Sequence, residues 1–214
     1  RMIARSAFDP AFTLAHYRFL LDAPVYSVVF LRTLWIALEV SALCLVLGYP
    51  VAFVLIRVSP GVRNVLILLL LFPLWTSILV RTFAWMALLG RNGAVNKMLL
   101  ALGLVEAPLR LIHNHTGVLI GMVHVLLPFM ILPLFSVMVR IPADLLEAAA
   151  GLGASGFQVF RRVFLPLSLP GVHAGTLLVF ISGLGFFVTP ALLGGRTETM
   201  IAMAIETYVV QFVN

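Results

Sequence analysis

The sequence predicts an all-α protein, a bundle of helices that crosses a lipid bilayer several times. The chain of 214 residues is 62% hydrophobic and 10% charged, with a mean hydropathy of +1.13. Soluble domains average about 45–50% apolar and about 25% charged residues. Four apolar runs are long enough to cross a hydrocarbon core, which takes roughly 20 helical residues. These runs are continuous and do not alternate, so helices are favoured over the strands of a barrel.

The four spans divide one membrane domain, residues 1–214, into alternating segments. We place the spans at 28–56, 64–90, 117–141 and 170–195. Proline lies inside or near several of them, which predicts kinked or broken spans. The motifs Gly117–Gly121 and Gly171–Gly175 have GxxxG spacing, which favours close helix packing within the chain.

The segments between the spans differ in character. The first segment, 1–27, is mixed and predicts an extramembrane stretch with a short amphipathic helix, and the last, 196–214, predicts an interfacial helix. A turn at 57–63 joins the first two spans, and a longer loop with a short apolar helix at 98–104 joins the next two. A semi-polar insert, 142–168, follows the third span. Because loops alternate sides, the turn and the insert share one face of the membrane.

Several classes of function are disfavoured by what the chain lacks. The net charge of +6 comes from basic residues scattered at span ends, which indicates membrane anchoring and gives no signal for nucleic acid. The only lysine, Lys97, follows Asn96, so a P-loop is absent and ATP cannot be hydrolysed in that way. His113 and His115 lack the further ligands of a metal site and predict a solvated loop. We therefore predict no catalytic residues and no metal. Cys44 is the single cysteine, so an internal disulfide is excluded.

The insert carries the helix signals of a structured element. Asp144 and Glu147 have the spacing of a capping box, three alanines follow, and we expect Gly151 and Gly153 to stop the helix. A second box, Ser155 with Gln158, predicts another helix.

We expect that second helix to run to about Leu165, with Pro166 and Pro170 ending it. The insert thus predicts helix, glycine elbow, helix. Leu145, Leu146, Phe157 and Phe160 need a partner if they are exposed. The alternative is an amphipathic loop that lies on the lipid surface.

The insert also carries a family motif: Glu-Ala-Ala (147–149), then Gly153, then Leu-Pro (165–166). This pattern resembles the cytoplasmic coupling motif of permeases in binding-protein-dependent ATP-binding cassette (ABC) importers. LGYPVAF (47–53), FPLWTSILVRTFAWM (72–86), LLGRNGAVN (88–96) and FVTPALLGG (187–195) resemble the spermidine/putrescine-type branch. The resemblance implies a type I importer permease fold. The family has six spans, and the four seen here correspond to spans two to five.

The resemblance also implies a role for each motif residue. Glu147, Ala148, Ala149, Gly153, Leu165 and Pro166 are then the residues that couple the permease to the ATPase. Relatives often carry two charged residues where this chain has Ala150 and Gly151, so part of the polar contact with the ATPase is missing. The chain itself holds no cofactor; ATP and magnesium bind the ATPase.

Two ionisable residues, Glu39 and Arg81, lie near the middle of predicted spans, where an ion costs roughly 2.5–3.5 kcal/mol. Either they pair with each other, or Arg81 faces a translocation pathway. The other candidates for that pathway are Trp75, Thr76, Phe186, Phe187 and Thr189. Polyamine permeases often have acidic residues where this chain has Phe186 and Ala191, which leaves room for a zwitterionic or carboxylate-bearing solute.

The function predicted is that of a multi-pass permease subunit in a bacterial inner membrane. The resemblance implies that a periplasmic binding protein delivers a small polar solute, polyamine-like or amino-acid-derived, and that an ATPase dimer drives transport. The second permease subunit is homologous, which makes a heterodimer. The alternative is an ion-coupled secondary transporter or channel subunit, for which only Glu39 offers a buried acid. An intramembrane enzyme lacks its motifs, and a purely structural subunit leaves the insert unexplained.

Overall fold

The computed structural model describes residues 24–195 and 197–213, and all regular elements of that part of the chain are helical. The long elements are α3 (Pro24–Leu55), α4 (Pro60–Leu71), α5 (Ile78–Leu89), α7 (His115–Met138), α10 (Leu165–Leu184) and α12 (Ile201–Val213). The short ones are the 3-10 turn η1 (Phe72–Trp75), α6 (Ala94–Ala101), α8 (Ala143–Gly151), α9 (Gly156–Val159), the π turn η2 (Phe160–Phe164) and α11 (Val188–Leu193). The predicted amphipathic helix within 1–27 falls mostly on residues 1–23, which lie outside the described part.

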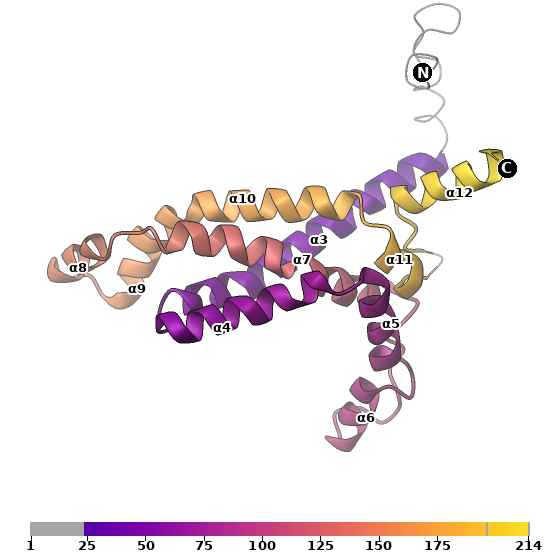
Figure 1. Ribbon diagram of the computed structural model, residues 1–214, viewed down its shortest axis with the longest axis horizontal. Coiled ribbons are helices and arrows are strands. Elements are labelled where there is room, and N and C mark those ends of the chain that lie inside the picture. The colour runs from indigo at the N-terminus through magenta and orange to yellow at the C-terminus, as the bar shows by residue number, and fades with distance from the viewer. Residues whose placement is uncertain (1–23, 196, 214) are drawn as a thin grey trace, which may run out of the picture.

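Three long helices, α3, α7 and α10, pack side by side and form the core (Figure 1). Small residues allow the close approach. A Cβ atom on Gly175 would lie 2.8 Å from Met130 Sδ, and one on Gly121 would lie 2.5 Å from Thr189 Cγ2. The prediction that both GxxxG motifs serve packing within the chain is therefore confirmed. The buried interior is apolar, with Val40, Met130 and others fully enclosed, as expected for helices that are joined by van der Waals contact within a membrane.

The predicted second span, 64–90, is broken in the structure. Its two halves, Pro60–Trp75 and Ile78–Ala101, meet at an angle of 99°. The break follows Pro73, which lies in η1, and Thr76 has an extended backbone with ψ of 148°. Proline limits the residue before it and removes a helical hydrogen bond. Three helices are long and apolar enough to span a membrane in the described part, or four if the bent pair counts as one.

The predicted fourth span, 170–195, is displaced. The apolar helix runs from Gly156 to Leu184, so Pro166 and Pro170 do not end a helix as we expected. Pro166 lies in the first turn of α10, directly after the π turn η2. A π turn widens the helix and relieves the clash between a proline ring and the preceding carbonyl groups. The chain leaves the helix at Gly185 and returns as the short helix α11.

The helix α3 is longer than its neighbours. Its 32 residues extend over about 48 Å at 1.5 Å per residue, whereas the hydrocarbon core is about 30 Å thick. A Cβ atom on Gly183, in the last turn of α10, would contact Ala37, and His115, the first residue of α7, contacts Glu39. Residues 37–39 of α3 therefore lie level with the ends of α7 and α10. Glu39 lies near the middle of the apolar stretch Tyr26–Leu55 of α3, as predicted, and level with one end of α7 and α10.

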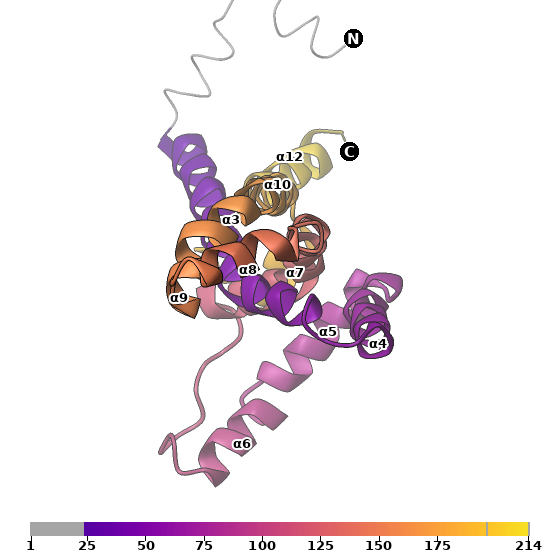
Figure 2. The same ribbon diagram turned by 90° about the vertical axis from the view of Figure 1, so that its left-hand side faces the viewer.

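The two ends of the bundle differ in what they carry. At one end, Ile56 and Arg57 line the same cavity as Ala143 and Gly156, so the turn after α3 and the insert share a face as predicted. The opposite end carries α11 and α12, and α5 and α6 project from it across the long axis (Figure 1, Figure 2). The predicted helix at 98–104 is α6, shifted toward the N-terminus, at Ala94–Ala101. The predicted helix at the C-terminus is α12.

Candidate coupling loop and translocation face

The insert folds as a helix, a glycine elbow and a second helix, as the sequence predicts. The helix α8 ends in a Schellman motif: Gly153 N–H donates to Ala150 O at 2.9 Å, and Ala154 N–H donates to Ala149 O at 3.2 Å. Gly153 has φ of +88°, a conformation that residues with a Cβ rarely adopt. The glycine therefore sets the direction in which the chain leaves α8. Gly151 is the last residue of α8 and not its stop.

The two predicted capping boxes have different outcomes. Ser155 caps α9: its Oγ accepts from Gln158 N–H at 3.4 Å, and Gln158 Oε1 accepts from Ser155 N–H at 2.8 Å. The box at Asp144 is wrong, because α8 begins at Ala143, two residues earlier than predicted, and Pro142 occupies the N-cap. Asp144 lies in the first turn instead, where its charge favours the positive end of the helix dipole.

The insert presents an exposed surface away from the core. Glu147 and Ala148 are exposed, and Ala149 is half-buried. Two large apolar side chains of the insert are mostly exposed: Leu152 is 90% exposed and Phe157 is 70% exposed. Exposed apolar side chains that are grouped with a charge are typical of a surface that a partner covers. Of the four apolar residues that we expected to need a partner, Leu145 and Phe157 are exposed, whereas Leu146 and Phe160 pack against the core.

Leu165 and Pro166 lie away from this exposed surface, at the start of α10. They belong to a rigid connection between the insert and the bundle. The ring of Phe160 packs against those of Tyr49 and Phe53 of α3, with centroids 6.3 and 5.7 Å apart, and the ring of Phe53 lies 5.1 Å from that of Phe164. Edge-on aromatic pairs at such distances are favourable beyond their burial. These ring contacts connect the end of the insert to α3 at the start of α10.

The candidate pathway residues fall into separate groups. Glu39 and Arg81 do not pair: Glu39 Oε2 lies 2.6 Å from His115 Nε2, while Arg81 Nε and Nη1 are buried without a hydrogen-bond partner among the described residues. The predicted solvated loop does not include His115, because His115 is the first residue of α7. The two side chains meet across 76 residues of sequence, a separation at which no local pattern gives a signal.

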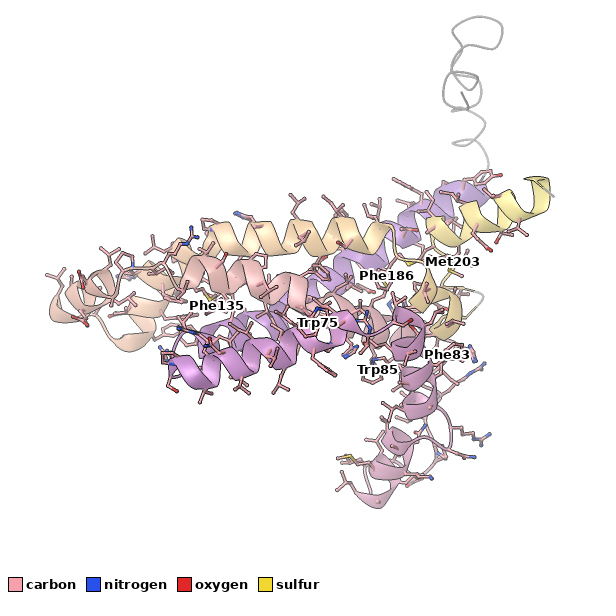
Figure 3. The ribbon with its side chains drawn as sticks, viewed as in Figure 1. Trp75, Phe83, Trp85, Phe135, Phe186 and Met203 are labelled. Carbon is pink, nitrogen blue, oxygen red and sulfur yellow. The ribbon has the colours of Figure 1, made fainter. Side chains whose placement is uncertain are left out.

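Trp75 and Thr76 lie at the break between α4 and α5. Trp75 is 75% exposed, and Figure 3 shows it at the inner end of α4, with Trp85 further along the chain on α5. Thr76 Oγ1 donates to Pro73 O at 2.8 Å. Arg81 follows in the next turn, so the structure brings these three residues to the start of α5.

The last group surrounds α11. Phe186 packs against the core at the point where α10 ends, Phe187 is the N-cap of α11, and Thr189 is buried. Thr189 Oγ1 lies 3.4 Å from Thr82 Oγ1 of α5. The structure therefore places α11 against α5, the helix that begins after the break. Arg81 directly precedes Thr82 on this helix.

Sequence reasoning missed Thr82 and Asn96 at this face, whereas for His124, in the predicted third span, it favours packing or a cavity hydrogen bond. Thr82 contacts α11, His124 of α7 packs its ring edge-on against Trp85 at 5.4 Å, and Asn96 is fully buried. Asn96 Nδ2 donates to Gly90 O at 3.1 Å and to Leu109 O at 2.9 Å, and its Oδ1 accepts from Leu109 N–H at 2.8 Å. It thereby fastens the loop before α7 to the end of α5. The sequence signal for this role is Asn96 itself, a polar residue at the end of the stretch LLGRNGAVN (88–96).

Comparison with known proteins gives consistent matches along the chain. Residues 24–214 match the family described as "Binding-protein-dependent transport system inner membrane component". The spermidine/putrescine transport system permease protein PotB of Escherichia coli (strain K12) is 42% identical over 203 residues, which cover 95% of this chain and 72% of the relative. The molybdenum transport system permease protein ModB of Mycobacterium bovis is 32% identical over 190 residues, covering 88% of this chain and 70% of the relative.

Solved structures share the fold. A crystal structure of a bacterial alginate ABC transporter in complex with an alginate-bound periplasmic protein has a chain that matches with a TM-score of 0.66 at 22% identity. The match covers 98% of this chain and 75% of that chain. At this level of identity the likeness establishes the fold alone.

Proposed function

Since the chain belongs to the family of binding-protein-dependent transport system inner membrane components, we propose that its insert is the surface through which an ATPase drives transport. Membership makes the chain a multi-pass permease subunit of an ABC importer in a bacterial inner membrane. The remaining assignments are the ATPase contact, the partners, the pathway and the solute.

One observation carries the assignment of the ATPase contact: the exposed helix α8 is fixed to the bundle at both of its ends. It follows α7 after a short turn, and its other end leads through the Gly153 elbow and the Ser155 cap into α9 and α10. Glu147 and Ala148 lie on its exposed surface. Small alanine side chains allow a partner to approach closely, and the Glu147 carboxylate can pair with a basic group. In this proposal α8 is the coupling helix, and ATP and magnesium are bound by the partner.

We further propose three protein partners: an ATPase dimer, a periplasmic binding protein, and a second permease subunit that is homologous but not identical. The exposed apolar surface of α4 supports a second membrane subunit, whether or not that subunit is identical to this one. None of the twelve residues of α4 is buried, and the apolar side chains of Val65, Leu68 and Leu69 are each more than half exposed. Lipid alone can solvate such a surface, so the composition of the purified complex decides the matter.

The proposed pathway runs along the start of α5 and past α11. Arg81 offers N–H groups without partners among the described residues. Trp75 and Thr76 lie at the break before α5, and Thr189 of α11 contacts Thr82 of α5. A break in a membrane helix exposes backbone groups that only a cavity or a partner can satisfy. The solute that we propose is small and polar, polyamine-like or amino-acid-derived. The spermidine/putrescine relative supports the first, and the lack of an acid at Phe186 and Ala191 supports the second.

The coupling assignment is tested by Glu147→Lys in the assembled complex. We expect at least a roughly tenfold loss of ATP-dependent uptake and weaker retention of the ATPase, because charge reversal turns an attraction into a repulsion. Membrane insertion should not change, since Glu147 is exposed. Glu106→Lys is the matched control, because Glu106 is exposed on the loop before α7. Equal uptake by both variants would contradict the assignment.

The solute is tested separately with the binding protein that co-purifies with the complex. A thermal-shift panel of spermidine, putrescine, amino acids, small carboxylates and sugars should give stabilisation by polyamines or by amino-acid-derived solutes, because a ligand that binds only the folded state raises its stability. A shift with sugars alone would contradict both solute classes.

A further inference from the structure

A cavity of about 460 Å³ lies behind α8, between the insert and the ends of α3 and α7. Its volume falls within the roughly 300–1,000 Å³ of small-molecule sites. The lining is apolar, with Ile56, Val139, Leu146 and Phe160 among its residues, and Arg57 is its only charged residue. Such a lining suits a hydrocarbon chain and provides one cation at the rim.

The position of the cavity also suits a molecule that is half apolar. It lies where α3 ends at Leu55 and α7 ends at Met138, which are two of the helices that are long and apolar enough to span a membrane. A helix that spans a membrane crosses a hydrocarbon core about 30 Å thick and ends near its boundary with water. A molecule in this cavity can therefore have one end in hydrocarbon and the other in water.

Arg57 is held in place but keeps free hydrogen-bond donors. Its guanidinium carbon lies 4.0 Å from the centroid of the Phe53 ring, and that ring packs edge-on against Phe160 and Phe164. Stacking uses the flat face of the guanidinium and leaves its N–H edge for a bidentate acceptor such as phosphate. In the described part of the chain, Arg57 forms no salt bridge with a carboxylate.

The surroundings of the cavity are basic. The stretches 56–63 and 139–165 contain five arginines, Arg57, Arg63, Arg140, Arg161 and Arg162, and two carboxylates, Asp144 and Glu147. None of the five pairs with a carboxylate of the described residues. Basic pockets beside membrane helices on the cytoplasmic side attract anionic lipid headgroups.

We propose that this cavity binds an anionic phospholipid of the cytoplasmic leaflet, with an acyl chain inside and the phosphate on Arg57. The sidedness rests on the proposed function, which places the insert in the cytoplasm. The ATPase does not compete for the cavity, because α8 faces it with Ala143, Leu146 and Ala150, while Glu147 and Ala148 are not among the lining residues. The bound lipid fills the space between α8 and the bundle and so stiffens the insert.

The proposal is tested by native mass spectrometry of the complete transporter in detergent, titrated with phosphatidylglycerol or with phosphatidylcholine. We expect the wild type to retain phosphatidylglycerol about tenfold more tightly. Arg57→Gln should abolish that preference, whereas Arg63→Gln should keep it, because Arg63 is equally basic but does not line the cavity. Val139→Trp fills the cavity without a change of charge, and should reduce the retention of both lipids.

Three results would overturn the proposal: equal retention of the two lipids by the wild type, an equal loss in Arg57→Gln and Arg63→Gln, or lipid release on ATPase binding. The second would indicate attraction to a diffuse basic surface, and the third would make the ATPase the occupant. If Arg57→Gln does not assemble, Val139→Trp still decides whether the cavity holds lipid. Lipid retention is measured without transport, so a failure of the lipid site and a failure of the proposed coupling role are distinguishable.

Discussion

The substitution Gly153→Ala isolates the role of the elbow in the insert. Gly153 has φ of +88°, and a Cβ atom built on it would meet no atom within 4 Å. The cost of the added methyl group is therefore the backbone strain alone. For a residue with a Cβ, the left-handed region costs about 1–2 kcal/mol, which corresponds to a factor of roughly 5–30 in an equilibrium.

The strain lowers the population of insert conformations that fit the ATPase. When only a fraction of molecules is competent to bind, the apparent dissociation constant rises by the inverse of that fraction. We therefore expect the affinity of the permease for its ATPase to fall by roughly 5–30-fold. Gly153→Asn should lose less, because asparagine enters the left-handed region more readily than alanine.

The assay is titration of the ATPase onto the purified permease complex, together with ATP-dependent uptake by proteoliposomes. Gly151→Ala is the matched control: its Cβ also meets open space, and its φ is not positive. It should bind the ATPase as the wild type does, since alanine is favourable in a helix. Equal affinity of the Gly153→Ala and Gly151→Ala proteins would refute the reasoning.

Three further predictions concern the packing of the bundle, the loop before α7, and Glu39. Gly175→Leu should destabilise the purified complex by about 1–3 kcal/mol through overpacking and so lower its melting temperature, because a Cβ at Gly175 would lie 2.8 Å from a methionine sulfur of α7. Gly61→Leu, in open space, should not change the melting temperature, and equal melting temperatures of the two variants would contradict the packing. Asn96→Ala removes three hydrogen bonds at a fully buried site, at a cost of about 1–3 kcal/mol. It should make the loop before α7 sensitive to protease, whereas the exposed Asn64→Ala should not. Glu39→Gln should leave uptake within about threefold of the wild type, since partly exposed ion pairs contribute about 0–1 kcal/mol, and a large loss would instead place Glu39 in the pathway.

Hydrophobic length predicted the bundle because membrane helices need continuous apolar runs. It located α3 and α7 closely, and the capping chemistry of Ser155 and the glycine at 153 located the elbow. Hydropathy did not separate a straight span from a broken one, since both halves around Thr76 are apolar. It also places the fourth span too late, because a proline at 166 predicts a helix end, whereas the π turn before Pro166 accommodates the ring.

The candidate pathway was predictable only as a set of residue types. An acid and an arginine in apolar runs suggested a pair, yet the partner of Glu39 is His115. Such contacts depend on how far α3 extends past its neighbours, which is a property of helix lengths and packing and not of local sequence. The contact between Thr82 and Thr189 likewise exists only because α11 folds back onto α5.

The central claim is that α8 docks on the ATPase, and disulfide cross-linking tests it most directly. The chain's single cysteine, Cys44, is fully buried, so Ala148→Cys introduces one accessible thiol on α8. Cross-linking of this complex to an ATPase that carries single cysteines across its surface should be efficient at one cleft and should block uptake until the disulfide is reduced. The control, Gly61→Cys, lies exposed near the turn after α3 and should not cross-link at that cleft. Efficient cross-linking at that cleft from Gly61→Cys with none from Ala148→Cys would contradict the account.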